Sequence, residues 1–315
     1  MAAPMRIAVL DDYQNVALQM ADWSAVTDRA DVTVFNDHIA DPDELAARLE
    51  PFDVVFVMRE RTPLPRSIIE RLPNLKMIAS TGPFNASIDM AAAEDHGIHV
   101  GTTGGTVAST VELTWALILA GVRNVVAESQ SVRVGGWQTS VGRELAGRTL
   151  GVLGLGRIGV RVARIGEAFG MKVIAWSQNL TPEAAAEAGA THVSREDLFA
   201  TADVLSVHLK LSGRSTGLVG AAELALMKPT ALLVNTSRGP IVDEAALVAA
   251  LRGRTIAGAA LDVFDTEPLP SGHPLRTLDN VLATPHIGYV ADRPYRIFFR
   301  DAVAAISDWL DANAQ

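Results

Sequence analysis

The chain has 315 residues, of which 49% are apolar and 20% are charged, and its formal net charge is −9. This length favours two domains, and the composition is that of a compact globular protein. The negative charge argues against a broad surface for nucleic acid or anionic membranes, and the absence of cysteine excludes disulfides, thiolate metal sites and cysteine nucleophiles.

The first third of the chain alternates short apolar runs with helical stretches. The apolar runs predict strands at residues 6–10, 32–35, 53–58 and 75–80. Between them, residues 41–50 predict a helix, because Asp41 can cap its start and Pro42 suits its first turn. Apolar runs of this kind suit a parallel sheet that helices cover on both faces.

A long helix is predicted over residues 107–127, between this series and a second one. Its most apolar part, from Leu113 to Val122, ends at Arg123 and is too short to cross a bilayer. The first residues of the chain also lack the apolar core of a signal peptide. We therefore expect no membrane partner and a cytoplasmic location.

The second series begins near Thr149. It predicts six further strands, at residues 149–155, 172–176, 203–209, 231–235, 256–263 and 280–285. A helix is predicted over residues 158–170, with positions 158, 162, 165 and 169 on its apolar face. Residues 293–310 form one more amphipathic pattern, which we expect to pack on the first unit. The sequence therefore predicts two α/β units of parallel strands.

Three glycines form the pattern G-x-G-x-x-G between a predicted strand and a predicted helix. Gly154 permits a tight turn, Gly156 lets the backbone approach a pyrophosphate, and Gly159 lets helix and strand pack closely. The start of the helix offers free N–H groups to the phosphates, and Arg157 adds a positive charge. The pattern predicts a dinucleotide-binding site.

The position that usually distinguishes the two nicotinamide dinucleotides carries no acid. Ser177 stands at the end of the next predicted strand, where an aspartate or glutamate commonly holds the ribose hydroxyls. Serine does not repel a 2′-phosphate, so NADP is admissible, but no Lys or Arg follows within residues 178–181. Ser177, Gln178 and Asn179 can also bond plain hydroxyls, and Lys210 could reach the adenosine end. NAD and NADP both stay open.

Four further polar residues follow predicted strands of the second series: Arg238, Asp262, Glu267 and His286. In an open parallel sheet, ligands bind beyond the carboxyl ends of the strands, so we expect these side chains to converge there, beside the nicotinamide. The set suits the reduction of a 2-keto acid. His286 would supply the proton, Glu267 would orient its ring, Arg238 would bind the substrate carboxylate, and Asp262 would meet the nicotinamide side.

The four stretches GVLGLGRIG, NTSRGPIVDE, ALDVFDTEP and TPHIG, in that order, resemble the D-isomer-specific 2-hydroxyacid dehydrogenase family. The resemblance implies Arg238, Glu267 and His286 as the catalytic residues. It also implies a flavodoxin-like substrate domain, residues 1–101 and 290–315, into which a Rossmann domain, residues 102–289, is inserted. Members are commonly homodimers, which would bury the apolar helix at 109–122 between subunits.

The resemblance extends to the residues that contact the ligands. The cofactor contacts that we expect are Gly154, Gly156, Arg157, Ile158, Gly159, Ser177, Gln178, His208, Thr236 and Asp262. The substrate contacts that we expect are Arg238 with Gly82, Phe84 and Asn85 of the loop at 80–89, and Arg59 or Arg61. This loop departs from the family pattern, because Pro83 has no N–H to donate and Phe84 replaces a glycine.

We therefore predict an oxidoreductase that transfers a hydride between NAD(P)H and a small 2-keto acid, such as glyoxylate, hydroxypyruvate or a larger pyruvate. Two alternatives stay open. One is a dinucleotide-sensing, corepressor-like module without enzyme activity, and the other is a formate or phosphite dehydrogenase of the same family. Glu267 disfavours formate, whose enzymes usually lack this acid. No metal site is predicted, since His96 and His99 have no evident third ligand.

Overall fold

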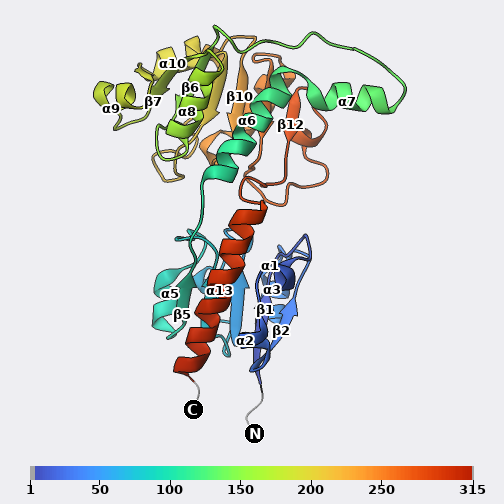
Figure 1. Ribbon diagram of the computed structural model, residues 1–315, viewed down its shortest axis with the longest axis vertical. Coiled ribbons are helices and arrows are strands. Elements are labelled where there is room, and N and C mark those ends of the chain that lie inside the picture. Colours follow the sequence, from blue (N-terminus) through green and yellow to red (C-terminus); the bar gives the residue numbers. More distant parts are fainter. Residues whose placement is uncertain (1–3, 314–315) are drawn as a thin grey trace. The chain divides into compact units, whose positions relative to one another are not determined.

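The computed structural model describes residues 4–313 and divides the chain into two compact units (Figure 1). Unit 1 comprises Met1–Thr106 and Ala291–Gln315, and unit 2 comprises Val107–Val290. The chain leaves unit 1 five residues later than the expected boundary at 101, because residues 103 and 104 are still bonded inside it. The Gly82 N–H donates to Thr103 Oγ1 (2.7 Å), and the Gly104 N–H donates to Asp301 Oδ2 (2.9 Å).

Unit 1 is built on a five-stranded parallel sheet. Its strands, in the order in which they pair, are β2 (Ala30–Val34), β1 (Met5–Val9), β3 (Val54–Val57), β4 (Met77–Ser80) and β5 (His99–Thr102). Both neighbours of β1 run parallel to it, which is the doubly wound order of flavodoxin-like folds. All four residues of β3 and of β4 are buried, as their unbroken apolar sequences predict.

Five short helices and one long helix cover this sheet. They are α1 (Ala17–Met20), α2 (Ser24–Thr27), α3 (Pro42–Leu49), α4 (Arg66–Ile69), α5 (Met90–Asp95) and α13 (Asp292–Ala312). Helix α3 begins as predicted, since the Asp41 carboxylate accepts the Asp43 and Glu44 N–H groups at 2.9 and 3.0 Å. Helix α13 packs on β4, β5, α1 and α2 of this unit, and its Phe299 ring stacks on Phe56 at 5.2 Å.

Unit 2 is built on a seven-stranded parallel sheet. Its strands, in pairing order, are β12 (Val281–Ala283), β11 (Gly258–Leu261), β10 (Leu232–Asn235), β9 (Val204–Val207), β6 (Thr149–Leu153), β7 (Lys172–Trp176) and β8 (Thr191–His192). Strand order reverses between β6 and β9, as in Rossmann sheets. The predicted fold class, two doubly wound parallel sheets, is confirmed.

The helices of unit 2 place two apolar cores on opposite faces of this sheet. They are α6 (Ala108–Val122), α7 (Val125–Arg133), α8 (Gly159–Ala168), α9 (Pro182–Glu187), α10 (Arg195–Thr201), α11 (Ala221–Leu226) and α12 (Glu244–Arg252), with 3-10 turns at Gly239–Ile241 and Pro274–Arg276.

The single helix expected at 107–127 is instead two helices. Asn124 adopts a left-handed backbone conformation (φ 52°), and α6 and α7 meet there at a bend of 64°. Within residues 4–313, no single helix is long and apolar enough to cross a membrane, and α6 with α7 reach that length only as this bent pair.

Helix α6 buries part of its apolar surface within its own unit, and its expected place between subunits stays a prediction. Its residues Val111, Trp115 and Ile118 are buried in the core of unit 2 itself, because α6 packs on β10 and β11. Helix α7 buries no residue, and Figure 1 shows it extending away from the rest of its unit. Most of the large exposed apolar side chains of this region therefore lie on α7 and the segment after it, and Leu119 of α6 is also 36% exposed.

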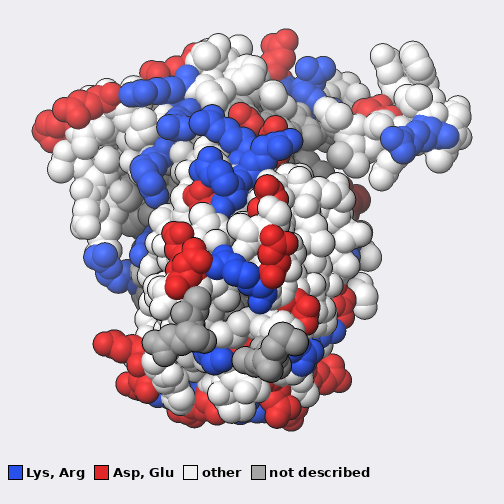
Figure 2. All heavy atoms as spheres, turned by 60° about the horizontal axis from the view of Figure 1, so that its bottom comes forward, with Lys and Arg blue, Asp and Glu red and all other residues white. Residues whose placement is uncertain are grey.

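The two units differ in charge. Unit 1 has 20 Asp and Glu against 11 Lys and Arg, whereas unit 2 has 16 of each, so unit 1 accounts for the whole net charge of −9. Figure 2 shows Lys and Arg side chains in blue and Asp and Glu side chains in red, interspersed on the surface in view.

Candidate active site

The carboxyl ends of five strands of unit 2 form one edge of its sheet. The register aligns the last residues of these strands, Leu153 with Val207, Val207 with Asn235, Asn235 with Leu261, and Leu261 with Ala283. Gly154 and Asp262 follow their strands directly, and Arg238 and His286 follow theirs three residues later. The topology therefore places the glycine loop and the predicted catalytic residues at the same edge.

The three glycines of the loop have three different surroundings. Gly154 has φ +101°, and a Cβ there would lie 2.8 Å from the His208 backbone. A Cβ on Gly159 would lie 2.2 Å from the Gly154 carbonyl oxygen, so the start of α8 can approach the strand only without a side chain. A Cβ on Gly156 would meet no atom within 4 Å. The protein itself does not require this glycine, which leaves room for a ligand over the backbone.

The start of helix α8 fits a bound anion. No side chain caps its first turn, and although the Val160 N–H donates to the Gly156 carbonyl oxygen at 2.9 Å, the N–H groups before it have no side-chain partner and can meet a ligand. Arg157 and Ile158 occupy the turn between Gly156 and the helix. A pyrophosphate is suited to this arrangement, because a helix N-terminus carries free donors and a partial positive charge. The residues present therefore fit the predicted dinucleotide.

His208 lies behind the glycine loop, and its ring pairs with Ser206 Oγ at 2.8 Å. Burial lowers the pKa of His208 to about 4, so its ring is neutral near pH 7. Because this ring is neutral, His208 adds no charge next to the glycine loop, where its backbone lies against Gly154.

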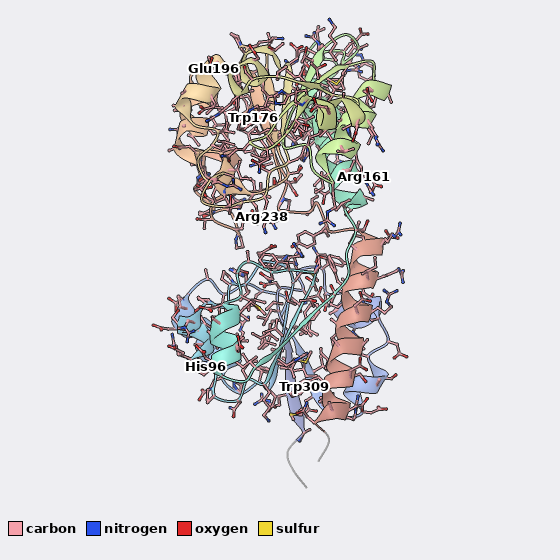
Figure 3. The ribbon with its side chains drawn as sticks, turned by 90° about the vertical axis from the view of Figure 1, so that its left-hand side faces the viewer. His96, Arg161, Trp176, Glu196, Arg238 and Trp309 are labelled. Carbon is pink, nitrogen blue, oxygen red and sulfur yellow. The ribbon has the colours of Figure 1, made fainter. Side chains whose placement is uncertain are left out.

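Ser177 begins a tight turn after β7, in which the Leu180 N–H donates to the Ser177 carbonyl oxygen at 3.0 Å. Ser177 is half-buried, whereas Gln178 and Asn179 are exposed. Trp176, labelled in Figure 3, precedes the turn, and the Arg195 guanidinium lies 6.0 Å from its ring centroid. Arg195 is already paired with Glu223 at 2.8 Å. Hydroxyl and amide groups therefore dominate the end of β7.

His286 and Glu267 form a close pair within unit 2. The distance from His286 Nδ1 to Glu267 Oε2 is 2.5 Å, and the other carboxylate oxygen, Oε1, accepts the Phe264 N–H at 2.9 Å. Because a carboxylate only accepts, Nδ1 carries a hydrogen and Nε2 is the ring nitrogen left for another partner. His286 has φ +52°, a conformation that is uncommon outside glycine and that often marks functional positions.

Asp262 holds the loop that carries His286. Its Oδ1 accepts from Thr284 Oγ1 (2.6 Å) and from the Ile287 N–H (2.8 Å), and its Oδ2 accepts from the Gly288 N–H (2.8 Å). The side chain is 1% exposed, and this burial raises the pKa of Asp262. These contacts make Asp262 a positioning residue for the loop, and its expected contact with the nicotinamide stays a prediction.

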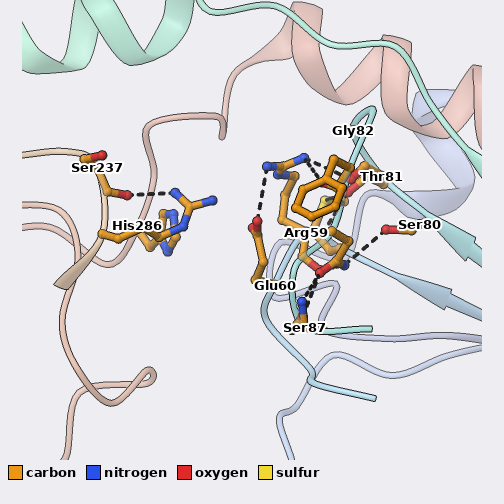
Figure 4. Close-up of polar contacts among 12 residues, drawn as sticks. Arg59, Glu60, Ser80, Thr81, Gly82, Ser87, Ser237 and His286 are labelled. Carbon is orange, nitrogen blue, oxygen red and sulfur yellow. Dashed lines mark hydrogen bonds and ion pairs between the residues drawn. The ribbon is translucent and has the colours of Figure 1, made fainter. Parts of the chain in front are cut away.

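Thr236 and Arg238 follow strand β10. Thr236 is 7% exposed, and its hydroxyl pairs with that of Thr114 in α6 at 2.8 Å. Arg238 is half-buried, and Figure 3 shows it at the margin of its unit. Its Nη1 donates to the Ser237 carbonyl oxygen at 2.7 Å, which is the contact drawn beside His286 in Figure 4. A forked guanidinium at this edge can bind a carboxylate through two hydrogen bonds.

The loop at 80–89 lies in unit 1, where Arg59 organises it (Figure 4). Arg59 Nη1 donates to the carbonyl oxygens of Thr81 (3.1 Å) and Phe84 (3.4 Å), and Arg59 Nη2 pairs with Glu60 at 3.4 Å. A Cβ on Gly82 would lie 1.7 Å from Arg59 Nη1, so the guanidinium fits only beside a glycine.

The other expected substrate contacts in this loop have structural partners. The Asn85 amide is 5% exposed, donates to the Arg59 carbonyl oxygen (2.6 Å) and accepts from the Ser87 N–H (3.0 Å). The Gly82 N–H is taken by Thr103, as described above. The Phe84 side chain is 54% exposed. Within this loop, Asn85 therefore fixes the backbone, and Phe84 presents an apolar surface.

Two residues near His286 were not anticipated from the sequence. Thr284 bonds Asp262, and the Tyr289 ring meets the His286 ring edge-on at 5.4 Å. Both flank His286 in the stretch TPHIGY, but only the folded loop shows that they contact the site. Among residues 4–313, no three His, Asp or Glu side chains gather as a group that could hold a metal ion.

Comparisons with known proteins relate the chain to one family of enzymes. Residues 115–288 match the sequence model of the D-isomer specific 2-hydroxyacid dehydrogenase NAD binding domain. The glyoxylate reductase of Aeropyrum pernix is 47% identical over 229 residues, which cover 70% of this chain and 68% of that protein.

Solved structures agree with this relationship. A phosphoglycerate oxidoreductase from Vibrio cholerae O395 superimposes with a TM-score of 0.93 at 39% identity, covering 98% of this chain and 99% of that one. The D-lactate dehydrogenase of Aquifex aeolicus, solved with NAD and lactic acid, gives a TM-score of 0.78 at 26% identity, covering 98% of this chain and 96% of that one.

Proposed function

The chain belongs to the D-isomer-specific 2-hydroxyacid dehydrogenase family, and we propose on that premise that it reduces glyoxylate and other small 2-keto acids. The predicted family and class of reaction, hydride transfer between NAD(H) and a 2-hydroxy or 2-keto acid, are confirmed. A non-enzymatic sensor and a formate or phosphite dehydrogenase are not favoured, since the relatives reported above are named as reductases or dehydrogenases of hydroxy acids.

The observation that carries this proposal is the 2.5 Å pair between His286 and Glu267, at the edge of the sheet that also carries the glycine loop. When bound, the reduced nicotinamide supplies the hydride that adds to the carbonyl carbon. His286 Nε2 gives the proton that the carbonyl oxygen then needs, and Glu267 keeps the ring oriented through its bond to Nδ1. Arg238 binds the substrate carboxylate and polarises the carbonyl. Asp262 keeps His286 in position.

The cofactor is NAD(H) at the level of the family, and the glycine loop, the start of α8 and Ser177 would hold it. We further propose that NADPH is accepted beside NADH. Ser177 supports this proposal, because a hydroxyl does not repel the 2′-phosphate as a carboxylate at the same position would.

Glyoxylate is the first substrate to test, because the proposal rests on the relative at 47% identity, and hydroxypyruvate and larger pyruvates are the next. The test is a panel of these keto acids with NADH and with NADPH, followed by the loss of absorbance at 340 nm. His286→Asn should lower turnover by about two to four orders of magnitude while NADH binds as before, since it removes the proton donor but not the glycine loop.

One control variant and one further variant of the site make this test specific. His96→Asn changes a histidine of unit 1 whose Nδ1 pairs with the Ala92 carbonyl oxygen at 2.9 Å, and it should leave turnover unchanged. Arg238→Ala should weaken binding of the keto acid by roughly tenfold or more. Full turnover in His286→Asn would remove this histidine from the mechanism, and no oxidation of NADH or NADPH by any keto acid would contradict the proposed substrate class.

We also propose that the enzyme is a homodimer in a cytoplasmic location. The support for a dimer is the apolar surface of α7 and the segment after it, where Val134, Trp137 and Val141 are 85%, 73% and 95% exposed. Such residues commonly mark a protein interface. Light scattering should give the mass of two chains for the wild type and of one chain for Trp137→Glu with Val134→Glu. A monomeric wild type would refute the dimer.

A further inference from the structure

A groove on unit 1 lies outside every residue that the reaction uses. Its volume is about 840 Å³, which is ample for a small metabolite. One wall is the connection between α1 and α2, with Met20 and Asp22, and the other wall is the first three turns of α13. Three arginines, Arg293, Arg296 and Arg300, line that second wall together with one acid, Asp292.

Two of these arginines are exceptional within their unit. Among residues 4–313, Arg293 and Arg296 have no ion pair, hydrogen bond or ring contact from their side chains, although unit 1 holds 20 acidic side chains. The other nine Lys and Arg of the unit each contact an acid, an oxygen or an aromatic ring. Arg300, for example, pairs with Asp301 at 2.7 Å. Unpaired cations side by side in so acidic a unit leave a place for an anion.

The spacing of the two arginines suits a phosphate group. Residues three apart on a helix are surface neighbours, about 5–6 Å apart at Cβ, so both guanidinium groups can bond the oxygens of one anion. The N-cap residue of α13 is Ala291, which has no side-chain acceptor, so the helix start offers N–H groups to an anion, and the two arginines outnumber the one carboxylate of the first turn, Asp292. The lining of the groove also includes the apolar side chains of Ile297 and Met20, which suit a carbon skeleton.

Asp22, on the opposite wall of the groove, limits which chemical groups the ligand can have besides its phosphate. Hydrogen bonds from the Ser24 backbone and side chain lower the pKa of Asp22, so its carboxylate is charged at neutral pH. A carboxylate there disfavours a second anionic group and accepts hydrogen bonds from hydroxyls. We propose that this groove binds a phosphate monoester of a small polyol, with its phosphate on Arg293 and Arg296 and its hydroxyls toward Asp22.

The test is calorimetric titration of the NADH-saturated protein with ribose 5-phosphate, ribose and inorganic phosphate. We expect ribose 5-phosphate to bind more tightly than inorganic phosphate, and ribose not to bind. The double variant Arg293→Gln with Arg296→Gln should bind ribose 5-phosphate at least tenfold more weakly than the wild type. Higher salt should lower the affinity further. Arg66→Gln is the matched control, because it removes an exposed arginine of the same unit that pairs with Asp95. This variant should leave the affinity for ribose 5-phosphate unchanged.

Three results would overturn the proposal. They are no binding of ribose 5-phosphate to the wild type, equal binding to the double variant, or weakening in Arg66→Gln as large as in the double variant. Asp22→Asn tests the second half of the inference, because it should strengthen inorganic phosphate and reduce the advantage of ribose 5-phosphate over it. An unchanged preference would remove Asp22 from the site. Glyoxylate turnover does not enter this test, so it stands whether or not the proposed substrate is correct.

Discussion

Gly156→Ala separates binding of the dinucleotide from stability of the fold. A Cβ at this position meets no protein atom within 4 Å, and Gly156 has no positive φ in the range that disfavours side chains. The free energy of unfolding should therefore stay constant or rise by about 0.4–1 kcal/mol, because alanine has fewer unfolded conformations than glycine. A pyrophosphate held against this backbone would instead collide with the new methyl group.

The expected effect on binding is a rise of roughly ten- to a hundredfold in the Kd for NADH, which corresponds to about 1.4–2.8 kcal/mol. The assay is fluorescence titration with NADH, beside thermal unfolding without cofactor. Gly159→Ala is the matched comparison. Its Cβ would lie 2.2 Å from the Gly154 carbonyl oxygen, so both the melting temperature and the affinity should fall. If Gly156→Ala binds NADH as tightly as the wild type does, the pyrophosphate does not lie over Gly156 and the assignment of the loop is wrong.

The remaining predictions concern three other positions. Ser177→Asp should lower kcat/KM with NADPH by tenfold or more relative to NADH, and an unchanged ratio of the two would show that position 177 does not face the 2′ group. Since the pKa of His208 is about 4 in the folded state and 6.5 ordinarily, the unfolded chain binds the extra proton between these values. The free energy of unfolding should thus fall by up to about 3 kcal/mol as the pH drops from 6.5 to 4, and urea titrations of His208→Gln should lack this slope. Asp262→Asn removes the acceptor of the Gly288 N–H and should lower kcat by about ten- to a hundredfold, with far-UV circular dichroism unchanged. An unaltered kcat would mean that the loop holds His286 without Asp262.

The sheets could be predicted from the sequence because their central strands are buried on both faces. The run at 53–58 contains β3, whose four residues are all buried, and local capping residues predicted the start of α3 at Asp41. The order of the strands could not be read in this way, since pairing depends on contacts between distant segments. Helices α1, α2 and α4 have only four residues each, too few to show a helical period.

Part of the candidate site could also be predicted from the sequence, and part of it could not. That His286 and Glu267 meet could be anticipated, since both follow strands that end at one edge. The threefold attachment of Asp262 to the loop depends on the turn at 284–288, where His286 takes a left-handed conformation that no pattern of residues signals. Likewise, the bend at Asn124 depends on one backbone angle inside a helical pattern.

The position of α13 in the chain has a consequence for the order of events during synthesis. Unit 1 is started first and completed last, because residues 292–312 leave the ribosome after the whole of unit 2. Until then, the face of the first sheet that Phe299 and Ile306 will cover is exposed, and Phe56 lacks its stacking partner. During synthesis, the first part of unit 1, Met1–Thr106, therefore stays incomplete while unit 2 is already whole, and a chain that ends before residue 292 would expose the uncovered face of the first sheet.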